Sequence, residues 1–371
     1  MGSSKQIIGN MFAAGGITIN GANPWDIQVQ NEKLYDRILS GGSIGFGESY
    51  MDGWWDCEQL DDLFFRIQYH QVDKMIPRDF TTLIYFLKSK YLNRQTKDRA
   101  KQVGYKHYDI GNEMYGKMLD KWMMYSCGYW DTATTLDEAQ EAKLDLMCRK
   151  LKLEKGMRLL DIGCGFGGMA QYAAQNYGVS VVGITISEQQ AIIARKINEG
   201  LPVEIRVQDY RELNEQFDRI VSIEMLEHVG YRNYAEYMQV AARNLTDDGI
   251  FLIQTMAGNH ATKITDPWID KYIFRNGMLP SVSQLATAWK RLFILEDLHN
   301  FGPHYDPILM AWRKNFEDSW ESIKHDYDEQ FYRMMRYYLS CSAASFRSRK
   351  NHVWHIVLAK KSKLNSYQSV R

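Results

Sequence analysis

The chain has 371 residues, more than one average domain, and 45% of them are hydrophobic, as in folded rather than disordered proteins. Its 45 basic and 45 acidic side chains balance, which argues against a general nucleic-acid-binding protein. The five cysteines form no CxxC pair, so we expect no disulfide framework and no metal site. With no apolar leader and no stretch long enough to span a bilayer, we expect a cytoplasmic protein whose membrane contact is peripheral.

Residues 1–78 predict a small, mostly helical N-terminal domain that ends near Pro77. An apolar segment runs from Leu60 to Ile67, and we expect the glycines before it to mark turns. These glycines are Gly41, Gly42, Gly45, Gly47 and Gly53.

Residues 79–101 predict a helical linker, because apolar side chains recur at helical spacing between Phe80 and Tyr91. The end of this segment is basic, with Lys88, Lys90, Arg94, Lys97, Arg99 and Lys101. Such a stretch is either an inter-domain connector with a solvated face or a surface that faces anionic lipid. The sequence leaves both interpretations open.

Residues 102–371 predict a catalytic domain in which short apolar runs alternate with helical stretches. Strands are expected at Arg158–Ile162, Val179–Ile184, Val203–Val207, Arg219–Ile223, Ile250–Thr255 and Val353–Ala359. Helices are expected at Ser187–Asn198, Asn233–Leu245, Ile308–Ile323 and Gln330–Phe346. This alternation predicts an α/β fold with a mostly parallel sheet that helices cover on both faces.

A glycine-rich loop follows the first strand of this domain. Gly163, Gly165 and Gly168 match the GxGxxG pattern, which is weak by itself. The carboxylate of Asp161, at the end of the strand, would repel a pyrophosphate but would attract the cationic amino-acid end of S-adenosylmethionine. We therefore predict a Rossmann-like, class I S-adenosylmethionine-dependent methyltransferase domain, with Asp161, Gly163 and Gly165 in the cofactor site.

The next two strand ends add candidate cofactor residues. The tip of the second strand carries the neutral Thr185, followed by Gln190, where a nicotinamide site would need an acidic residue. Asp209 and Tyr210 follow the third strand and would suit an adenine, through a hydrogen bond and a ring stack. Tyr210 could equally be a core aromatic.

Several strings across nearly the whole chain resemble the bacterial cyclopropane fatty acid synthases and the mycolic acid cyclopropane synthases. They are Gly47–Trp55, His107–Asn112, Tyr125–Trp130, Leu160–Gly165, Glu227–Gly230, Lys271–Phe274, His299–Gly302 and Tyr337–Cys341. The resemblance implies that an alkene of an unsaturated membrane phospholipid attacks the cofactor's methyl group. A base then removes a proton from the transferred carbon, and a ring closes. It also implies a homodimer that involves the N-terminal domain.

The resemblance further implies a bicarbonate ion as the base. Motif matching assigns its shell to Cys127, Glu227, Tyr305 and Cys341, with Gln254 as a further donor, and adds Tyr125 and Ser126 to the cofactor site. Among these residues, we expect Glu227 to accept a proton at neutral pH.

Two positions depart from the family pattern. Gln254 stands where many relatives have histidine, and Glu224 stands where many have glycine. Both leave the product open. One alternative is an S-adenosylmethionine-dependent enzyme that methylates a lipid or a small molecule without closing a ring. A second is a lipid-binding protein without catalysis, against which the intact glycine loop and Glu227 argue.

Overall fold

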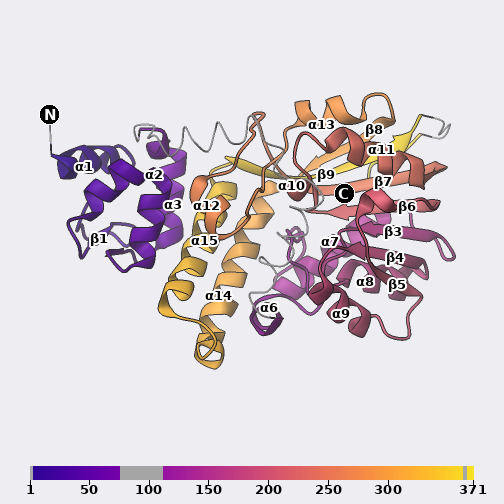
Figure 1. Cartoon of the computed structure of the whole chain (residues 1–371), viewed down its shortest axis with the longest axis horizontal. Helices are drawn as coiled ribbons and strands as arrows, with labels where there is room; N and C mark the ends of the chain where they lie inside the picture. Colours follow the sequence, from indigo (N-terminus) through magenta and orange to yellow (C-terminus); the bar gives the residue numbers. More distant parts are fainter. Residues whose placement is uncertain (1–2, 76–111, 362–365) are drawn as a thin grey trace. The chain divides into compact units, whose positions relative to one another are not determined.

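The computed structural model describes residues 3–75, 112–361 and 366–371 (Figure 1). The predicted linker at 79–101 lies outside these ranges, as does His107. The chain forms two compact units, which are described separately. Within the described ranges, one unit comprises residues 3–75, 263–276 and 305–351, and the other comprises residues 112–262, 277–304 and 352–371.

The first unit is mostly helical. Its helices are α1 (Ser4–Ala14), α2 (Leu34–Met51), α3 (Leu60–Tyr69), α12 (Pro267–Tyr272), α14 (Tyr305–Ile323) and α15 (Glu329–Arg347), with a short 3₁₀ turn at Val72–Lys74. Two-residue strands β1 (Gln28–Val29) and β2 (Trp55–Asp56) pair antiparallel. Aromatic rings fill the space where α15 packs on α2 and α3, and Tyr337 contacts Phe64 at 4.7 Å between ring centroids.

The prediction that glycines mark turns in this unit is wrong for most of them. Gly41, Gly45 and Gly47 lie within α2, which has non-helical backbone angles only at Gly42, where φ is 53°. There the glycine permits a kink that residues with a Cβ rarely adopt. The domain boundary near residue 78 stays a prediction, because it lies outside the described ranges. The packing of residues 263–276 and 305–351 with the N-terminal helices was not anticipated.

The second unit is an α/β layer structure around a seven-stranded sheet. Its parallel strands are β3 (Arg158–Ile162), β4 (Ser180–Thr185), β5 (Val203–Val207), β6 (Phe217–Ile223) and β7 (Leu245–Gly258). The sheet order is β5-β4-β3-β6-β7-β9-β8, in which β8 (Phe293–Asn300) and β9 (Asn351–Lys360) pair antiparallel. The predicted mostly parallel sheet is confirmed.

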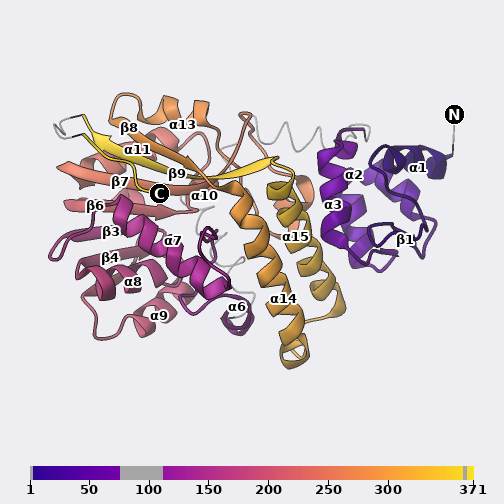
Figure 2. The ribbon, with the colours of Figure 1, turned by 180° about the vertical axis from the view of Figure 1, so that it is seen from behind.

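Helices cover both faces of this sheet (Figures 1 and 2). One face carries α7 (Leu136–Lys150), α8 (Gly168–Tyr177) and α9 (Glu188–Ile197), and the other carries α10 (Leu226–Val229), α11 (Tyr234–Asn244) and α13 (Val282–Trp289). Alternate residues of β3 serve the two layers, because Leu159 packs with α8 whereas Leu160 packs with α11. Short helices α6 (Asn112–Met118), η2 (Tyr210–Glu212) and η3 (Gly302–His304) complete the unit.

The predicted strands and helices of the sheet region all form, within a few residues of the expected ends. Strand β8 and helix α7 were not predicted. None of the helices in the described ranges is long and apolar enough to cross a membrane.

Candidate functional site

The candidate residues of the α/β unit gather where its parallel strands end. Asp161 lies near the end of β3, Thr185 ends β4, and Glu224 follows β6 directly. Carboxyl ends of parallel strands share one edge of a sheet, and open α/β sheets bind ligands at that edge. The sequence therefore places these side chains on the edge that suits a cofactor.

The glycine loop is tied to the neighbouring strand and leaves space above it. The N–H groups of Gly163 and Cys164 both donate to the carbonyl of Ile184, at 3.0 and 2.9 Å. Gly165 has φ of 53°, and a Cβ added there would meet no atom of the described residues within 4 Å. Glycine is thus required by the backbone angle and not by crowding, and the open space fits a ligand that approaches the backbone.

Asp161 is a buried carboxylate that lacks a hydrogen-bond partner among the described residues. It is 1% exposed, and neither of its oxygens has a hydrogen-bond partner in the described part of the chain. Burial raises its pKa to about 7, although the charge of Lys143 acts in the opposite direction. A buried, unpaired carboxylate is costly unless a donor joins it, so this position fits the cationic amino group of S-adenosylmethionine.

Two side chains of helix α7 form hydrogen bonds with the segment that contains Tyr125 and Ser126. The ammonium of Lys143 donates to the Ser126 hydroxyl at 2.9 Å, and the Gln140 side chain donates to the Ser126 carbonyl at 2.8 Å. Lys143 is fully buried, and burial lowers its pKa to about 8 against the attraction of Asp120, Glu224 and Asp161.

Sequence reasoning missed both Lys143 and Gln140. The only signal was the helix start itself, where Thr135 and Glu138 form a capping box. Tyr125, by contrast, was a candidate, and its ring packs edge-on against Tyr115, 5.3 Å between centroids. Tyr115 in turn contacts Phe166 of the glycine loop. Tyr125 and Ser126 therefore lie next to the loop that the cofactor is expected to cover.

The remaining cofactor candidates differ in their surroundings. Thr185 donates to the Gln190 side chain at 2.9 Å, and both are buried. The carboxylate of Asp209 accepts from the N–H of Arg211. Tyr210 lies in the core with its ring edge-on to Tyr237, 5.1 Å between centroids, which is the alternative that the sequence left open. A stack of adenine on Tyr210 stays a prediction.

Glu227 is buried beside a second carboxyl group. Its Oε1 accepts from the Thr255 hydroxyl at 3.0 Å and from the Met256 N–H at 2.5 Å. Its Oε2 has no hydrogen-bond partner among the described residues. Burial, and secondly the charge of Glu224, raise the pKa of Glu227 to about 8. A raised pKa favours the protonated acid, and the expectation that Glu227 accepts a proton at neutral pH stays a prediction.

Glu224 and Gln254, the two departures from the family pattern, contact each other. The Gln254 Nε2 donates to Glu224 Oε1 at 3.0 Å and to the Cys127 carbonyl at 3.0 Å. The Cys127 N–H donates to the same Oε1 at 2.9 Å. The Cys127 thiol is fully buried, which raises its pKa well above the ordinary value, so the thiol itself stays neutral.

His355 of β9 fixes the orientation of the side-chain amide of Gln254. Burial holds the pKa of His355 well below its ordinary value, so the ring is neutral. Its Nε2 lies 2.9 Å from Gln254 Oε1, an oxygen that can only accept. The amide nitrogen is thereby directed toward Glu224. His355 was not a candidate in the sequence, since nothing local marks a histidine inside a strand as part of a site.

Tyr305 and Cys341 belong to the helical unit, so their predicted place in the base shell stays a prediction. Tyr305 begins α14 and is buried, with its ring 4.7 Å from that of Phe346. The Cys341 thiol donates to the Tyr338 carbonyl, and burial raises the pKa of this thiol. As with Cys127, a neutral thiol is expected at physiological pH.

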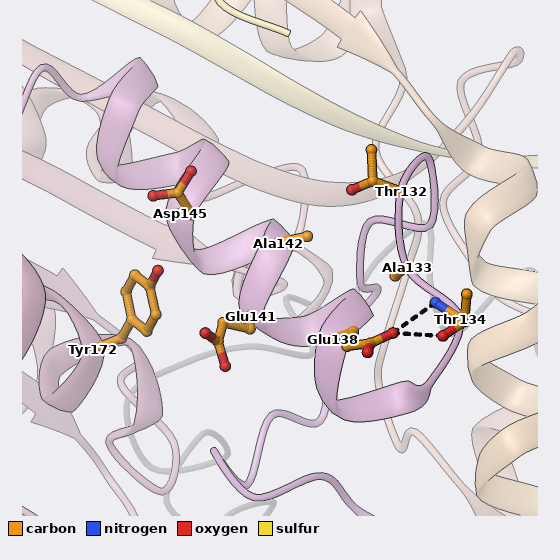
Figure 3. A pocket seen from close by; sticks show the side chains of 8 residues that line it. All are labelled: Thr132, Ala133, Thr134, Glu138, Glu141, Ala142, Asp145 and Tyr172. Atoms are coloured by element: carbon orange, nitrogen blue, oxygen red, sulfur yellow. Dashed lines mark hydrogen bonds between the residues drawn. The ribbon is translucent and has the colours of Figure 1, made fainter.

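A pocket of about 520 Å³ lies on the solvent face of α7 (Figure 3). Residues at helical spacing line it, among them Glu138, Glu141 and Asp145, and Glu138 accepts hydrogen bonds from Thr134. It contains none of the predicted site residues. Helix α7 thus presents carboxylates to solvent, whereas Lys143 and Gln140 face the interior.

Comparison with known proteins agrees with this geometry. The family model described as mycolic acid cyclopropane synthetase matches residues 95–356. The chain is 48% identical over 355 residues to the cyclopropane-fatty-acyl-phospholipid synthase of Escherichia coli, which covers 96% of this chain and 93% of that protein. It is 32% identical over 338 residues to the tuberculostearic acid methyltransferase of Mycobacterium tuberculosis, with 85% and 79% covered.

A solved structure extends the likeness to three dimensions. The mycolic acid cyclopropane synthase CmaA1, complexed with SAH and CTAB, aligns with a TM-score of 0.66 and 31% identity, covering 71% of this chain and 99% of that one. The predicted class I methyltransferase fold and the use of S-adenosylmethionine are confirmed by these relatives. The chain belongs to the mycolic acid cyclopropane synthetase family.

Proposed function

We propose that this enzyme adds a one-carbon unit from S-adenosylmethionine to the cis double bond of unsaturated acyl chains in membrane phospholipids and closes a cyclopropane ring. The proposal is supported most by two features that lie at one edge of the sheet, in a chain that belongs to this family. One is the carboxylate of Asp161, which lacks a hydrogen-bond partner among the described residues and lies beside the open glycine loop, and the other is the carboxyl pair of half-buried Glu224 and buried Glu227.

The cofactor residues would act by binding and orientation. Asp161 would hold the ammonium of S-adenosylmethionine, and the backbone at Gly165 would let the ligand approach closely. When bound, the cofactor supplies an electrophilic methyl carbon. Lys143 would balance the negative charge of the site and hold Ser126 in place. Thr185, Gln190 and Asp209 are proposed contacts of the rest of the ligand.

Ring closure requires that the transferred carbon lose a proton in a water-poor site, since water would trap a cation as an alcohol. Two of the donors expected to hold the bicarbonate ion that the family resemblance implies are already engaged. The N–H of Cys127 and the amide of Gln254 both bind the Glu224 carboxylate already. The bicarbonate requirement that the resemblance implies is untested, and removal of bicarbonate from the assay would test it.

The substrate lies in a bilayer, so we propose peripheral contact with the inner face of the membrane by a cytoplasmic homodimer. The support is the basic end of residues 79–101 in the sequence, which suits anionic headgroups. Light scattering of the purified enzyme would test the dimer.

The function is tested by expressing the protein in cells that contain unsaturated phospholipids and analysing the acyl chains by mass spectrometry and ozonolysis. Cyclopropanation adds the mass of one CH₂ group and removes the alkene that ozone cleaves. A chain that gains the same mass but is still cleaved has been methylated without ring closure. Unchanged chains, with cofactor binding intact, would support a lipid-binding protein without catalysis.

A further inference from the structure

We propose that the carboxylate of Glu224 is the proton acceptor for ring closure, in the place that a free anion would otherwise take. The inference rests on the proposed function and adds the residue that performs its last step. It begins from a disagreement between the anion that the family resemblance implies and the donors that this chain offers.

Two donors of the expected anion shell are engaged by the chain itself. Two N–H groups converge on one oxygen of Glu224, that of Cys127 at 2.9 Å and that of Gln254 at 3.0 Å. His355 orients the Gln254 amide, and the Gln254 Nε2 also binds the Cys127 carbonyl. Charge-assisted hydrogen bonds of this kind stabilise a carboxylate in its ionised form. A second anion would find these donors engaged and would face the negative charge of Glu224.

The charges of the neighbours favour ionised Glu224 and protonated Glu227. The charge of Glu224 raises the pKa of Glu227, so ionisation of both carboxyl groups together is disfavoured. Glu227 is the more deeply buried of the two, and its Oε2 lacks a partner among the described residues. Glu224 interacts electrostatically with the buried Lys143, a cation that favours the carboxylate. The half-buried position of Glu224 also allows it to exchange its proton afterwards.

The backbone at Glu224 supports a functional role. Its φ is 50°, in the left-handed region that residues with a Cβ rarely adopt. Such strain persists where the surrounding structure holds it, and it concentrates at functional sites. Here the backbone N–H of Cys127 and the side-chain amide of Gln254 hold the carboxylate in place.

The step balances without a further reactant. A C–H bond of the transferred carbon breaks, its electron pair forms the second C–C bond of the ring, and the proton moves to a carboxylate oxygen of Glu224. Glu224 then returns this proton to solvent. The reaction therefore requires no bicarbonate, in contrast to the prediction from the family resemblance.

The test measures cyclopropane formation on unsaturated phospholipid vesicles in CO₂-free buffer, with and without added bicarbonate or formate. Wild type is expected to respond to neither anion. Glu224→Gln should lose turnover by about 10²–10⁴-fold, the usual contribution of a general base, and should not recover, because the amide fills the position. Glu224→Gly should lose as much and then regain part of its turnover with bicarbonate or formate, which can enter the vacated space.

Folding is controlled separately. Glycine suits a φ of 50°, so Glu224→Gly should keep the thermal unfolding midpoint and the cofactor affinity of wild type. The double variant Glu224→Gly with Gln254→His is expected to show the strongest bicarbonate dependence, since imidazole offers a donor to a free anion.

Three results would overturn the proposal: wild-type turnover that depends on bicarbonate, near-normal turnover of Glu224→Gln, or a folded Glu224→Gly variant that neither anion rescues. A wild type that forms no cyclopropane in any buffer, while it binds the cofactor, would instead contradict the proposed function.

Discussion

Replacement of Asp161 by asparagine is expected to stabilise the empty enzyme and to weaken its cofactor binding. The carboxylate is fully buried with no protein hydrogen bond in the described ranges, and burial raises its pKa from 3.8 to about 7. An acid whose pKa is higher in the folded state holds its proton more tightly there. Ionisation of Asp161 therefore opposes folding, and the destabilisation is absent below pH 3.8 and complete above about pH 7.

The size of the effect follows from the shift. About three pKa units, at about 1.4 kcal/mol for each unit, correspond to about 4 kcal/mol of folding free energy in the ionised state. Asp161→Asn removes this charge, so its free energy of unfolding at about pH 8 should exceed that of wild type by up to about 4 kcal/mol. Below pH 3.8 the two proteins should differ little, because Asp161 is then protonated in both states.

Cofactor binding should show the opposite preference. The ammonium of S-adenosylhomocysteine requires the ionised carboxylate, so wild-type affinity should fall by about tenfold for each pH unit below 7 and level off above it. Asp161→Asn should bind more weakly at neutral pH and lose this dependence. Calorimetry from about pH 5 to about pH 8, with urea unfolding of both proteins, measures the two effects. A wild-type affinity that stays constant over this range would refute the reasoning.

Three further changes test other parts of the site. Gly165→Val should abolish S-adenosylmethionine binding in calorimetry, a larger loss than that of Asp161→Asn. The control is Gly200→Val, at a glycine with similarly open surroundings and positive φ, which should lower stability and keep binding. Glu227→Gln resembles the protonated acid, so its turnover on vesicles should fall less than that of Glu224→Gln, and an equal loss would contradict a protonated Glu227. Neutralising four side chains of the predicted linker with glutamine should reduce sedimentation with anionic vesicles at low salt and spare cofactor affinity, at about 1 kcal/mol for each charge. These four are Lys88, Lys90, Arg94 and Lys97. Unchanged sedimentation would make the segment a connector only.

The sequence by itself determined the elements whose signals are local. The apolar run at 158–162, the glycines after it and the helical spacing beyond predict a strand, a turn and a helix, and the structure contains all three. Such patterns depend on backbone angles and on side-chain periodicity within a few residues. Strand β8 was not predicted, because charged residues interrupt its alternation of apolar and polar side chains. Asp297 on it is buried with Lys150, a partner that lies 147 residues away in the chain.

Only the tertiary structure decided which site residues contact each other and how their pKa values shift. The Cys127 N–H and Glu224 are 97 residues apart, and Gln254 and His355 are 101 apart, so no local pattern links them. The order of the strands brings them together at one edge of the sheet. Within the described ranges, this arrangement leaves Asp161 without a hydrogen-bond partner. Burial and the charge of Glu224 raise the pKa of Glu227, because a pKa depends on solvent exclusion and on neighbouring charges and not on residue type alone.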